Sequence, residues 1–214
     1  CAALQRKRYQ MLNPKFLAGF SDEQKKFNPR YRWNEESVFY WERAVRVSTG
    51  EAVLVPAQLA HWNYIFDDEE PRLQETNTNG AGGMYTREGA ILAGLYELIQ
   101  RDALLIFWLN SIAPPKVRPE TVPSEDFQSL LGESRRYGFR VHCLNVTTDT
   151  GVPSFLVFLE DETKHWPRLS IGAGCNADPE RALYRALVEA WSIYDWPRPN
   201  APYRLEEPYQ PFRD

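Results

Sequence analysis

A glycine-rich segment directly ahead of a long amphipathic stretch is where this sequence could do chemistry. Gly80, Gly82 and Gly83 lie among small and polar residues, and apolar residues at helical spacing follow from position 91 onward. Small residues let backbone N–H groups approach a ligand, and a helix that begins just after such a loop adds unpaired N–H donors and the positive end of its dipole. The combination suits an anion such as phosphate, and a tight structural turn is the alternative.

The helix expected to begin near Thr86 carries a second polar cluster. Glu97 and Arg101 stand four positions apart, a spacing that produces an ion pair on the surface of many helices. At about 100° per residue, positions 85, 89, 97 and 100 or 101 can also share one side of that helix. Glu97 and Arg101 therefore form either a surface ion pair or part of the lining of a cavity.

This region resembles the core of the YcaO family, the ATP-dependent peptide cyclodehydratases. The resemblance runs without gaps over residues 79–103, where the family has a glycine-rich turn followed by an ordered helix that ends in E-L-I-E-R-D-A. Further matching strings are FSDEQ at residues 20–24, GEAVLVPAQL at residues 50–59 and the last-helix string at residues 170–190. These separate motifs, in the family's order, extend the resemblance over nearly the whole chain.

The resemblance implies an enzyme that activates a backbone amide oxygen of a ribosomally made precursor peptide with phosphate from ATP. A Cys, Ser or Thr side chain of that peptide attacks, and loss of phosphate leaves a thiazoline or oxazoline ring; some relatives make thioamides or amidines. Bacteriocin biosynthesis is the implied setting. The implied cofactors are ATP and Mg²⁺. The implied partners are the precursor peptide and an E1-like leader-binding protein, and pairing with a second copy of the chain is left open.

The resemblance also assigns residues to the nucleotide site. The expected nucleotide-binding residues are Thr78, Asn79, Glu97, Gln100 and Arg101. The expected metal ligands are Glu97 and Glu189, because Mg²⁺ prefers carboxylate oxygens together with phosphate. Each assignment has a structural alternative: Thr78 and Asn79 could cap the turn, and Glu189 could be a solvated charge.

Three residues depart from the family pattern at this site. Tyr85, Gly89 and Gln100 stand where the family has Asn, Glu and Glu. Two carboxylates are thereby lost from a site that would hold a divalent cation, at a cost of a few kcal/mol for each charge-assisted contact. ATP and Mg²⁺ binding are in doubt for this reason. The departures motivate a second hypothesis, a non-catalytic YcaO-like scaffold or peptide-binding subunit, and a third is an unrelated enzyme that shares only the glycine turn.

Composition excludes several other classes of protein. The chain has 214 residues, of which 43% are hydrophobic, enough to bury a real core. A formal charge of −4 argues against a nucleic-acid-binding protein. Cys1, Cys143 and Cys175 are odd in number and widely spaced, which argues against a disulfide framework and a zinc site and favours a reducing cytoplasm. No apolar run approaches the ~20 residues that a membrane helix needs.

Turn and capping signals place the remaining elements. We expect a β-hairpin from strands 45–47 and 52–55 around Gly50, and an acidic loop over residues 67–71. Pro123 should open a second helix that ends near Tyr137, and Asp178 should cap a last helix that runs to about Tyr194. Further strands are expected over residues 139–146, 154–159 and 169–171.

These elements interleave without a regular βαβ rhythm, which predicts an α+β fold. The YcaO-like fold implied by the resemblance has mixed, mostly antiparallel sheets packed with helices. We expect a single partial domain over residues 1–214 that lacks the family's N-terminal ATP-site segment and its C-terminal tail.

Overall fold

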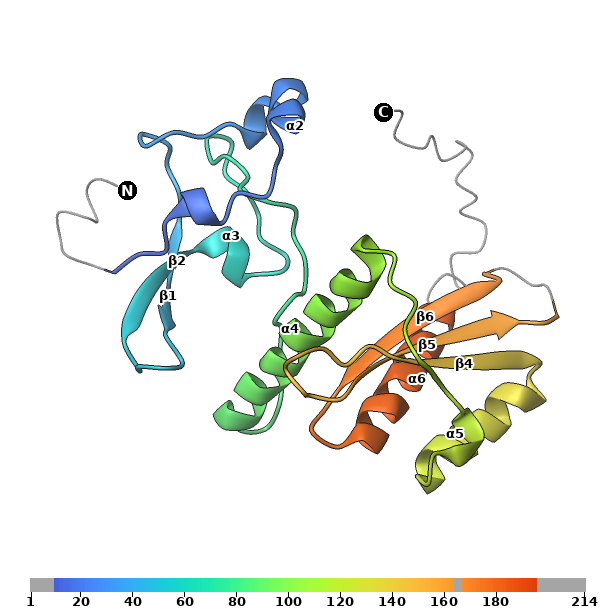
Figure 1. Ribbon diagram of the computed structural model, residues 1–214. Helices are drawn as coiled ribbons and strands as arrows, with labels where there is room; N and C mark the ends of the chain where they lie inside the picture. Colours follow the sequence, from blue (N-terminus) through green and yellow to red (C-terminus); the bar gives the residue numbers. More distant parts are fainter. Residues whose placement is uncertain (1–9, 164–166, 196–214) are drawn as a thin grey trace. The chain divides into compact units, whose positions relative to one another are not determined.

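The structure is a computed structural model, and it describes residues 10–163 and 167–195. Cys1 lies outside these residues. The chain divides into two compact units, residues 1–78 and 79–214 (Figure 1). Helices and antiparallel sheets occur in both units, so the predicted α+β class is confirmed. A single partial domain over the whole chain stays a prediction.

The first unit holds a two-stranded sheet and short helices. Its elements are η1 (Pro14–Phe16), α2 (Asp22–Phe27), η2 (Pro29–Tyr31), β1 (Trp41–Val45), β2 (Ala52–Pro56) and α3 (Ala57–Ala60). The predicted hairpin is present, but its first strand was placed wrongly: it ends at Val45 instead of beginning there. Val45 pairs with Ala52, so residues 46–51 form the connection, in which Gly50 has a φ of 74° that favours glycine.

The acidic loop of the first unit contains one deeply buried carboxylate. Glu70 is 2% exposed and accepts hydrogen bonds from Gln58 Nε2 at 3.2 Å, Tyr64 Oη at 2.6 Å and the Tyr40 backbone N–H at 3.3 Å. Burial raises the pKa of Tyr64, and its hydrogen bond to Glu70 raises that pKa further. A buried carboxylate is retained only where donors replace its water. The sequence pattern predicted a loop but missed that Glu70 anchors it to the rest of the unit.

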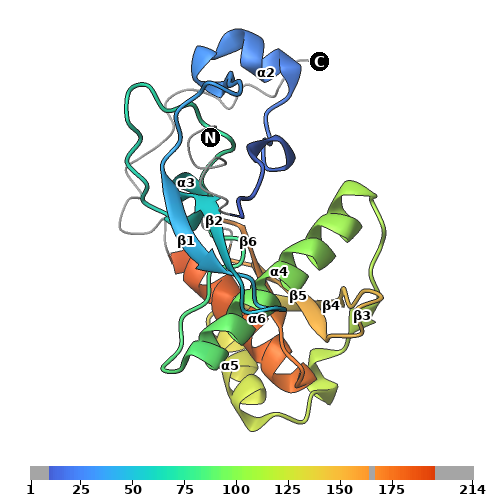
Figure 2. The ribbon, with the colours of Figure 1, turned by 90° about the vertical axis from the view of Figure 1, so that its left-hand side faces the viewer.

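The second unit is a four-stranded antiparallel sheet between helices. Its elements are α4 (Arg87–Leu109), β3 (Lys116–Val117), η3 (Pro119–Thr121), α5 (Glu125–Arg136), β4 (Phe139–Asn145), β5 (Ser154–Asp161), β6 (Leu169–Cys175) and α6 (Pro179–Asp195). The strand order is β3-β4-β5-β6, which leaves β6 at an edge. Helix α4 lies on one face of the sheet, and α5 and α6 cover the other (Figure 2).

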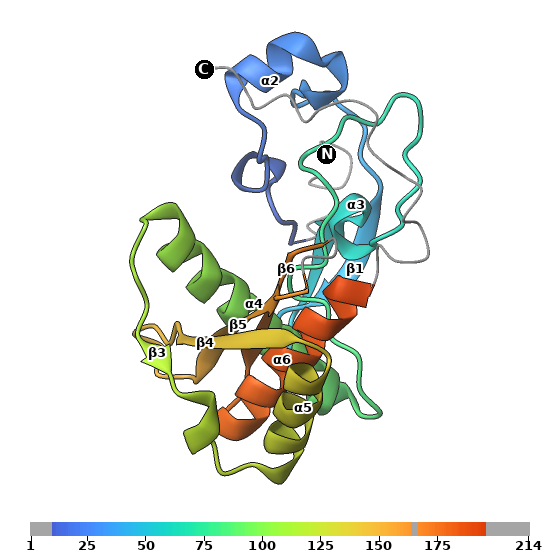
Figure 3. The ribbon, with the colours of Figure 1, turned by 90° about the vertical axis from the view of Figure 1, so that its right-hand side faces the viewer.

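Alternating side chains along the central strands fill both faces of this sheet. Val157 and Leu159 of β5 face the main core with Leu187 of α6, and all three are fully buried. Leu156, which comes directly before Val157 and therefore points to the other face, lies in a smaller core with Ala103 of α4. Successive side chains of a strand point to opposite faces. This parity is why helices can pack against both sides of β5 (Figure 3).

The helices begin where capping residues predict. Thr86 Oγ1 accepts the Gly89 N–H at 3.1 Å at the start of α4, and Asp178 Oδ1 accepts the Glu180 N–H at 3.0 Å at the start of α6. The prediction that Pro123 opens α5 was wrong by a small margin. Ser124 is the N-cap, because its Oγ accepts the Phe127 N–H at 3.3 Å.

The last strand is longer than predicted, because glycine allows it to approach α6 closely. We expected a strand over residues 169–171 only, whereas β6 continues through Gly172 and Gly174 to Cys175. A Cβ at Gly172 would lie 2.1 Å from the Ala186 carbonyl oxygen, and one at Gly174 would lie 2.0 Å from the Ala182 carbonyl oxygen. The glycines therefore continue the strand where any side chain would collide with the helix backbone.

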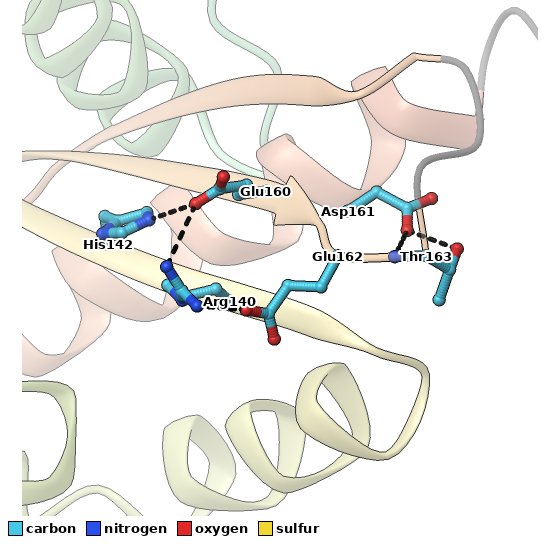
Figure 4. A network of polar contacts seen from close by, with 6 residues as sticks. All are labelled: Arg140, His142, Glu160, Asp161, Glu162 and Thr163. Carbon is cyan, nitrogen blue, oxygen red and sulfur yellow. Dashed lines mark hydrogen bonds and ion pairs between the residues drawn. The ribbon is translucent and has the colours of Figure 1, made fainter.

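Charged side chains of β4, β5 and the residue that follows β5 form a polar network (Figure 4). His142 Nε2 lies 3.0 Å from Glu160 Oε2, and Arg140 lies 3.9 Å from the same oxygen and pairs also with Glu162. The hydrogen bond with His142 lowers the pKa of the Glu160 carboxyl. Within residues 10–163 and 167–195, no group of three or more acids, histidines or cysteines could hold a metal ion.

Removing His142 should move the titration of Glu160. In His142→Ala we expect the pKa of the Glu160 carboxyl to rise toward its ordinary value, measured by ¹³C NMR. Because the folded-state pKa of Glu160 is lowered, its contribution to stability is present above the unfolded-state pKa and is lost as pH falls through the folded value. The stability difference between wild type and Glu160→Gln should therefore shrink on acidification. An unchanged Glu160 titration in His142→Ala would contradict the pairing.

Candidate functional site

A pocket of about 370 Å³ lies beside the edge strand of the second unit. Its polar lining comes from α4 and α6: Glu97, Gln100, Arg185, Glu189 and Ser192. Its remaining lining comes from Ala173 of β6 and from Tyr184 and Val188 of α6. The pocket thus combines charged groups from two helices on opposite faces of one sheet.

Helix periodicity accounts for the α6 side of the pocket. Arg185, Glu189 and Ser192 follow one another at spacings of four and three, which places them on one side of a helix. The opposite side of α6 is fully buried against the sheet through Ala186 and Ala190. The same burial that anchors the helix therefore turns its polar side toward the pocket.

Glu97 both forms an ion pair and lines the pocket. Its Oε1 accepts from Arg101 Nε at 2.8 Å, and its Oε2 accepts from Gln100 Nε2 at 3.4 Å. Its side chain is 21% exposed. The sequence left a choice between a surface ion pair and a cavity lining, and the structure contains both arrangements.

Glu189 is held at the free edge of β6. Its Oε2 accepts the backbone N–H of Ala173 at 2.9 Å, and among residues 10–163 and 167–195 no further strand pairs with β6 on that side. Burial raises the pKa of the Glu189 carboxyl; the hydrogen bond and the charge of Arg101 lower it, and the charge of Glu97 raises it. The Glu189 side chain is thus partly buried and hydrogen-bonded, and its role as a metal ligand stays a prediction. The two carboxylates of the pocket are close enough to influence one another.

The donor set of the pocket fits a magnesium ion shared with phosphate. Mg²⁺ in nucleotide sites takes one or two protein carboxylates, phosphate oxygens and water, and does not need an all-protein cage. Glu97 and Glu189 supply two carboxylates to one pocket. Gln100, which is 8% exposed, adds a neutral amide where the family has a third carboxylate.

The other predicted site residues lie elsewhere. Arg101 is paired with Glu97 and is not among the residues that line the pocket. Thr78 is the last residue of the first unit and Asn79 the first of the second, and both are exposed. Tyr85 is fully exposed. Roles for Thr78, Asn79 and Arg101 in nucleotide binding stay predictions.

The glycine-rich segment has a packing role of its own. A Cβ at Gly82 would lie 2.2 Å from the Ala90 carbonyl oxygen, and a Cβ at Gly94 would lie 2.6 Å from the Gly80 carbonyl oxygen. Gly80 has a φ of 78°. The segment therefore lies directly against the backbone of α4, and packing and backbone conformation account for Gly80 and Gly82 without a ligand; a Cβ at Gly83 would meet nothing within 4 Å.

Sequence reasoning missed five pocket residues, which are Ala173, Tyr184, Arg185, Val188 and Ser192. Arg185 stands four positions before Glu189, so the i, i+4 spacing on the last helix was the available signal. Tyr184 and Val188 carry no comparable signal, because aromatic and aliphatic residues on a helix belong to a core more often than to a site.

No helix in the described part of the chain is long and apolar enough to cross a membrane.

Comparison with known proteins relates this fold and pocket to one family. The family model of the YcaO cyclodehydratases, described as binding ATP and Mg²⁺, matches residues 2–209. An uncharacterized protein of Methanothermobacter thermautotrophicus is 32% identical over 157 residues, which are 72% of this chain and 40% of that protein. The chain thus spans less than half the length of this relative.

Solved structures of two such proteins share the fold. A heterocyclase in complex with substrate and cofactor has a TM-score of 0.74 at 24% identity, over 87% of this chain and 27% of that one. The YcaO protein of Methanopyrus kandleri, bound with AMPPCP and Mg²⁺, has a TM-score of 0.59 at 26% identity, over 75% of this chain and 42% of that one. With the family model matching almost from end to end, the chain belongs to the YcaO family.

Proposed function

We propose that this chain is part of a YcaO-type enzyme that matures a ribosomally made peptide by ATP-dependent activation of a backbone amide. The observation that carries the proposal is the convergence of Glu97 and Glu189, from two different helices, in one pocket. Two carboxylates in a partly buried pocket match the ligand preference of magnesium bound to phosphates. Family membership supports the same chemistry.

In this proposal the pocket residues bind and orient. A Cys, Ser or Thr side chain of the peptide would first attack the amide carbon. The amide oxygen would then take up the phosphate that magnesium–ATP supplies, with release of ADP, and loss of that phosphate would leave the azoline ring. Glu97 and Glu189 would hold the metal, and Arg101 keeps the Glu97 carboxylate in place through its ion pair. The Ala173 N–H holds Glu189 in the same way. Fixed ligands lose little freedom on binding, which favours affinity.

The proposed partners are the precursor peptide and a protein that binds its leader. Both come from the family resemblance, and whether two copies of the chain associate is left open. Cys143 and Cys175 are free, buried thiols, and burial raises the pKa of Cys143 to about 12. Free thiols suit a reducing compartment, which supports the proposed cytoplasmic location.

A non-catalytic scaffold is the second candidate, and two positions favour it. Gly89 provides no carboxylate, and a Cβ there would already lie 3.0 Å from Thr86 Oγ1 and 3.1 Å from Met84 Cβ. A glutamate at position 89 would therefore need these neighbours to move. Tyr85 points into solvent where the family has an amide. A protein with this pocket could have kept its peptide contacts and lost its nucleotide.

Calorimetric titration of the complete protein with magnesium–ATP separates the two candidates. Phosphate release in the presence of precursor peptide and leader-binding partner is the second measurement. Saturable binding together with peptide-dependent phosphate release supports the enzyme and excludes the scaffold. Absence of both rejects the catalytic form.

Restoring the lost carboxylate at position 100 should strengthen magnesium–ATP binding. Gln100 lines the pocket and donates to Glu97, so Gln100→Glu brings a third negative charge beside two others. We expect roughly tenfold tighter binding of magnesium–ATP and a lower melting temperature without the nucleotide, since like charges repel in a partly buried site. Thermal melts with and without magnesium–ATP measure both effects. Equal or weaker binding would place the metal away from position 100.

A further inference from the structure

Tyr96 joins α4 to the turn that leads from β6 into α6. Its Oη accepts the backbone N–H of Ala177 at 3.2 Å. Ala177 lies between Cys175, the last residue of β6, and Pro179, the first residue of α6. The hydrogen bond therefore connects the helix that carries Glu97 to the start of the other helix of the pocket, and Tyr96 itself is not among the residues that line the pocket.

Helix α4 is attached to the rest of the unit at two points on one side of the helix. Ala103 is fully buried in the smaller core with Leu156 and Ala173. Tyr96 precedes Ala103 by two turns, so the two side chains lie within about 20° of each other around the helix and ~10 Å apart along it. Apolar packing at one point and a directional hydrogen bond at the other together fix the tilt of α4 over β6.

The distance between the two candidate metal ligands depends on this tilt. Glu97 directly follows Tyr96 and projects from α4 about 100° away from it. Its ion pair with Arg101 lies within α4, so the pair orients the carboxylate relative to its own helix only. Glu189 is held separately, by the backbone N–H of Ala173 at 2.9 Å. The position of Glu97 relative to Glu189 is therefore set by how α4 lies on the sheet.

We propose that Tyr96 is a positioning residue that holds Glu97 at the distance from Glu189 that one magnesium ion requires. The inference rests on the proposed function, because it concerns the metal site of that proposal. Mg²⁺ demands near-ideal octahedral geometry with metal–oxygen distances of about 2.0–2.1 Å, so a small displacement of one carboxylate weakens the site. In this proposal Tyr96 touches neither the metal nor the nucleotide, and it acts through the placement of α4.

Tyr96→Phe tests the proposal, because it removes the hydroxyl and keeps the ring. We expect hydrogen exchange of the Ala177 amide, followed by NMR, to become about three- to tenfold faster. The Ala182 amide, which donates to the Asp178 carbonyl oxygen at 3.0 Å, should keep its rate as the internal reference. In calorimetric titration of the complete protein with ATP, the magnesium concentration for half-maximal binding should rise about three- to tenfold. The melting temperature without nucleotide should stay close to that of wild type, because the lost hydrogen bond is exposed.

Tyr137→Phe is the matched control. Tyr137 follows α5, is 59% exposed and lies outside the pocket lining, so loss of its hydroxyl should change neither the magnesium requirement nor the exchange of Ala177. Faster exchange of Ala177 in Tyr96→Phe with an unchanged magnesium requirement would leave the hydrogen bond a structural role only and overturn the proposal. Unchanged exchange of Ala177 would overturn the contact itself. If the unmodified complete protein bound no magnesium–ATP, this inference and the proposed function would fail together.

Discussion

Glu189→Gln is expected to lose magnesium–ATP binding by about hundredfold or more. Even residues that only orient metal ligands change affinity 10–100-fold, and glutamine offers no charge to a divalent cation. The carboxylate is one of the two that the pocket provides, so Glu97 alone would have to hold the metal. Calorimetric titration with magnesium–ATP measures the loss. Glu133→Gln, which removes a half-exposed carboxylate on α5, should bind as wild type does.

The same substitution should leave the protein at least as stable as wild type. A glutamine amide oxygen can accept the Ala173 N–H in place of the carboxylate. Because burial raises the folded-state pKa of Glu189, its contribution to stability is complete at low pH and is lost as pH rises through that pKa. The melting temperature of Glu189→Gln relative to wild type should therefore increase from pH 5 to pH 8. If Glu189→Gln melted at a lower temperature than wild type and also failed to bind magnesium–ATP, Glu189 would have only a structural role.

Gly172→Ala is expected to disrupt the packing of β6 against α6. The added methyl would lie 2.1 Å from the Ala186 carbonyl oxygen and 2.3 Å from the Ala190 nitrogen, and both are backbone atoms that cannot rotate away. Overpacking of this kind costs about 3 kcal/mol or more, a large share of the ~5–15 kcal/mol that stabilises a typical domain. Thermal denaturation should show a melting temperature lower by roughly 6–12 °C, or the variant should not fold at all.

A second glycine provides the opposite expectation within the same unit. Gly132 lies inside α5, and a Cβ there would meet no atom within 4 Å. Gly132→Ala should therefore stabilise the protein by about 0.5–1 kcal/mol, because alanine loses less backbone freedom in a helix. If the melting temperature of Gly172→Ala equalled that of Gly132→Ala, the close contact between β6 and α6 would be refuted. Comparison of the two variants separates the cost of steric collision from the gain that comes from reduced backbone freedom.

Local signals predicted the helices of the second unit well. Thr86, Asp178 and the residue pair at 123–124 mark helix starts through hydrogen bonds that span three residues or fewer, so neighbouring residues contain all the information. The length of β6 was underestimated for the opposite reason. Whether Gly172 and Gly174 end a strand or continue it depends on the backbone of α6, which local sequence does not describe.

The residues of the candidate site likewise divide into those that the sequence predicted and those that it did not. Glu97 and Glu189 were identified from motif strings, because a motif keeps residue type and spacing along one helix. Arg185 was missed, although it stands one turn before Glu189 on α6 and lines the same pocket. Glu70 was assigned to an acidic loop, and the sequence did not show that it is buried and accepts hydrogen bonds from Tyr40, Gln58 and Tyr64.

By itself, the sequence determined the α+β class, the helix starts and the family to which the chain belongs, because these depend on spacing and capping along short stretches. Only the tertiary structure decided which charged groups meet. Glu97 and Glu189 share a pocket because α4 and α6 pack on opposite faces of a sheet beside the same edge strand. Burial, charge pairing and free hydrogen-bond donors are properties of that packing, and no single segment carries them.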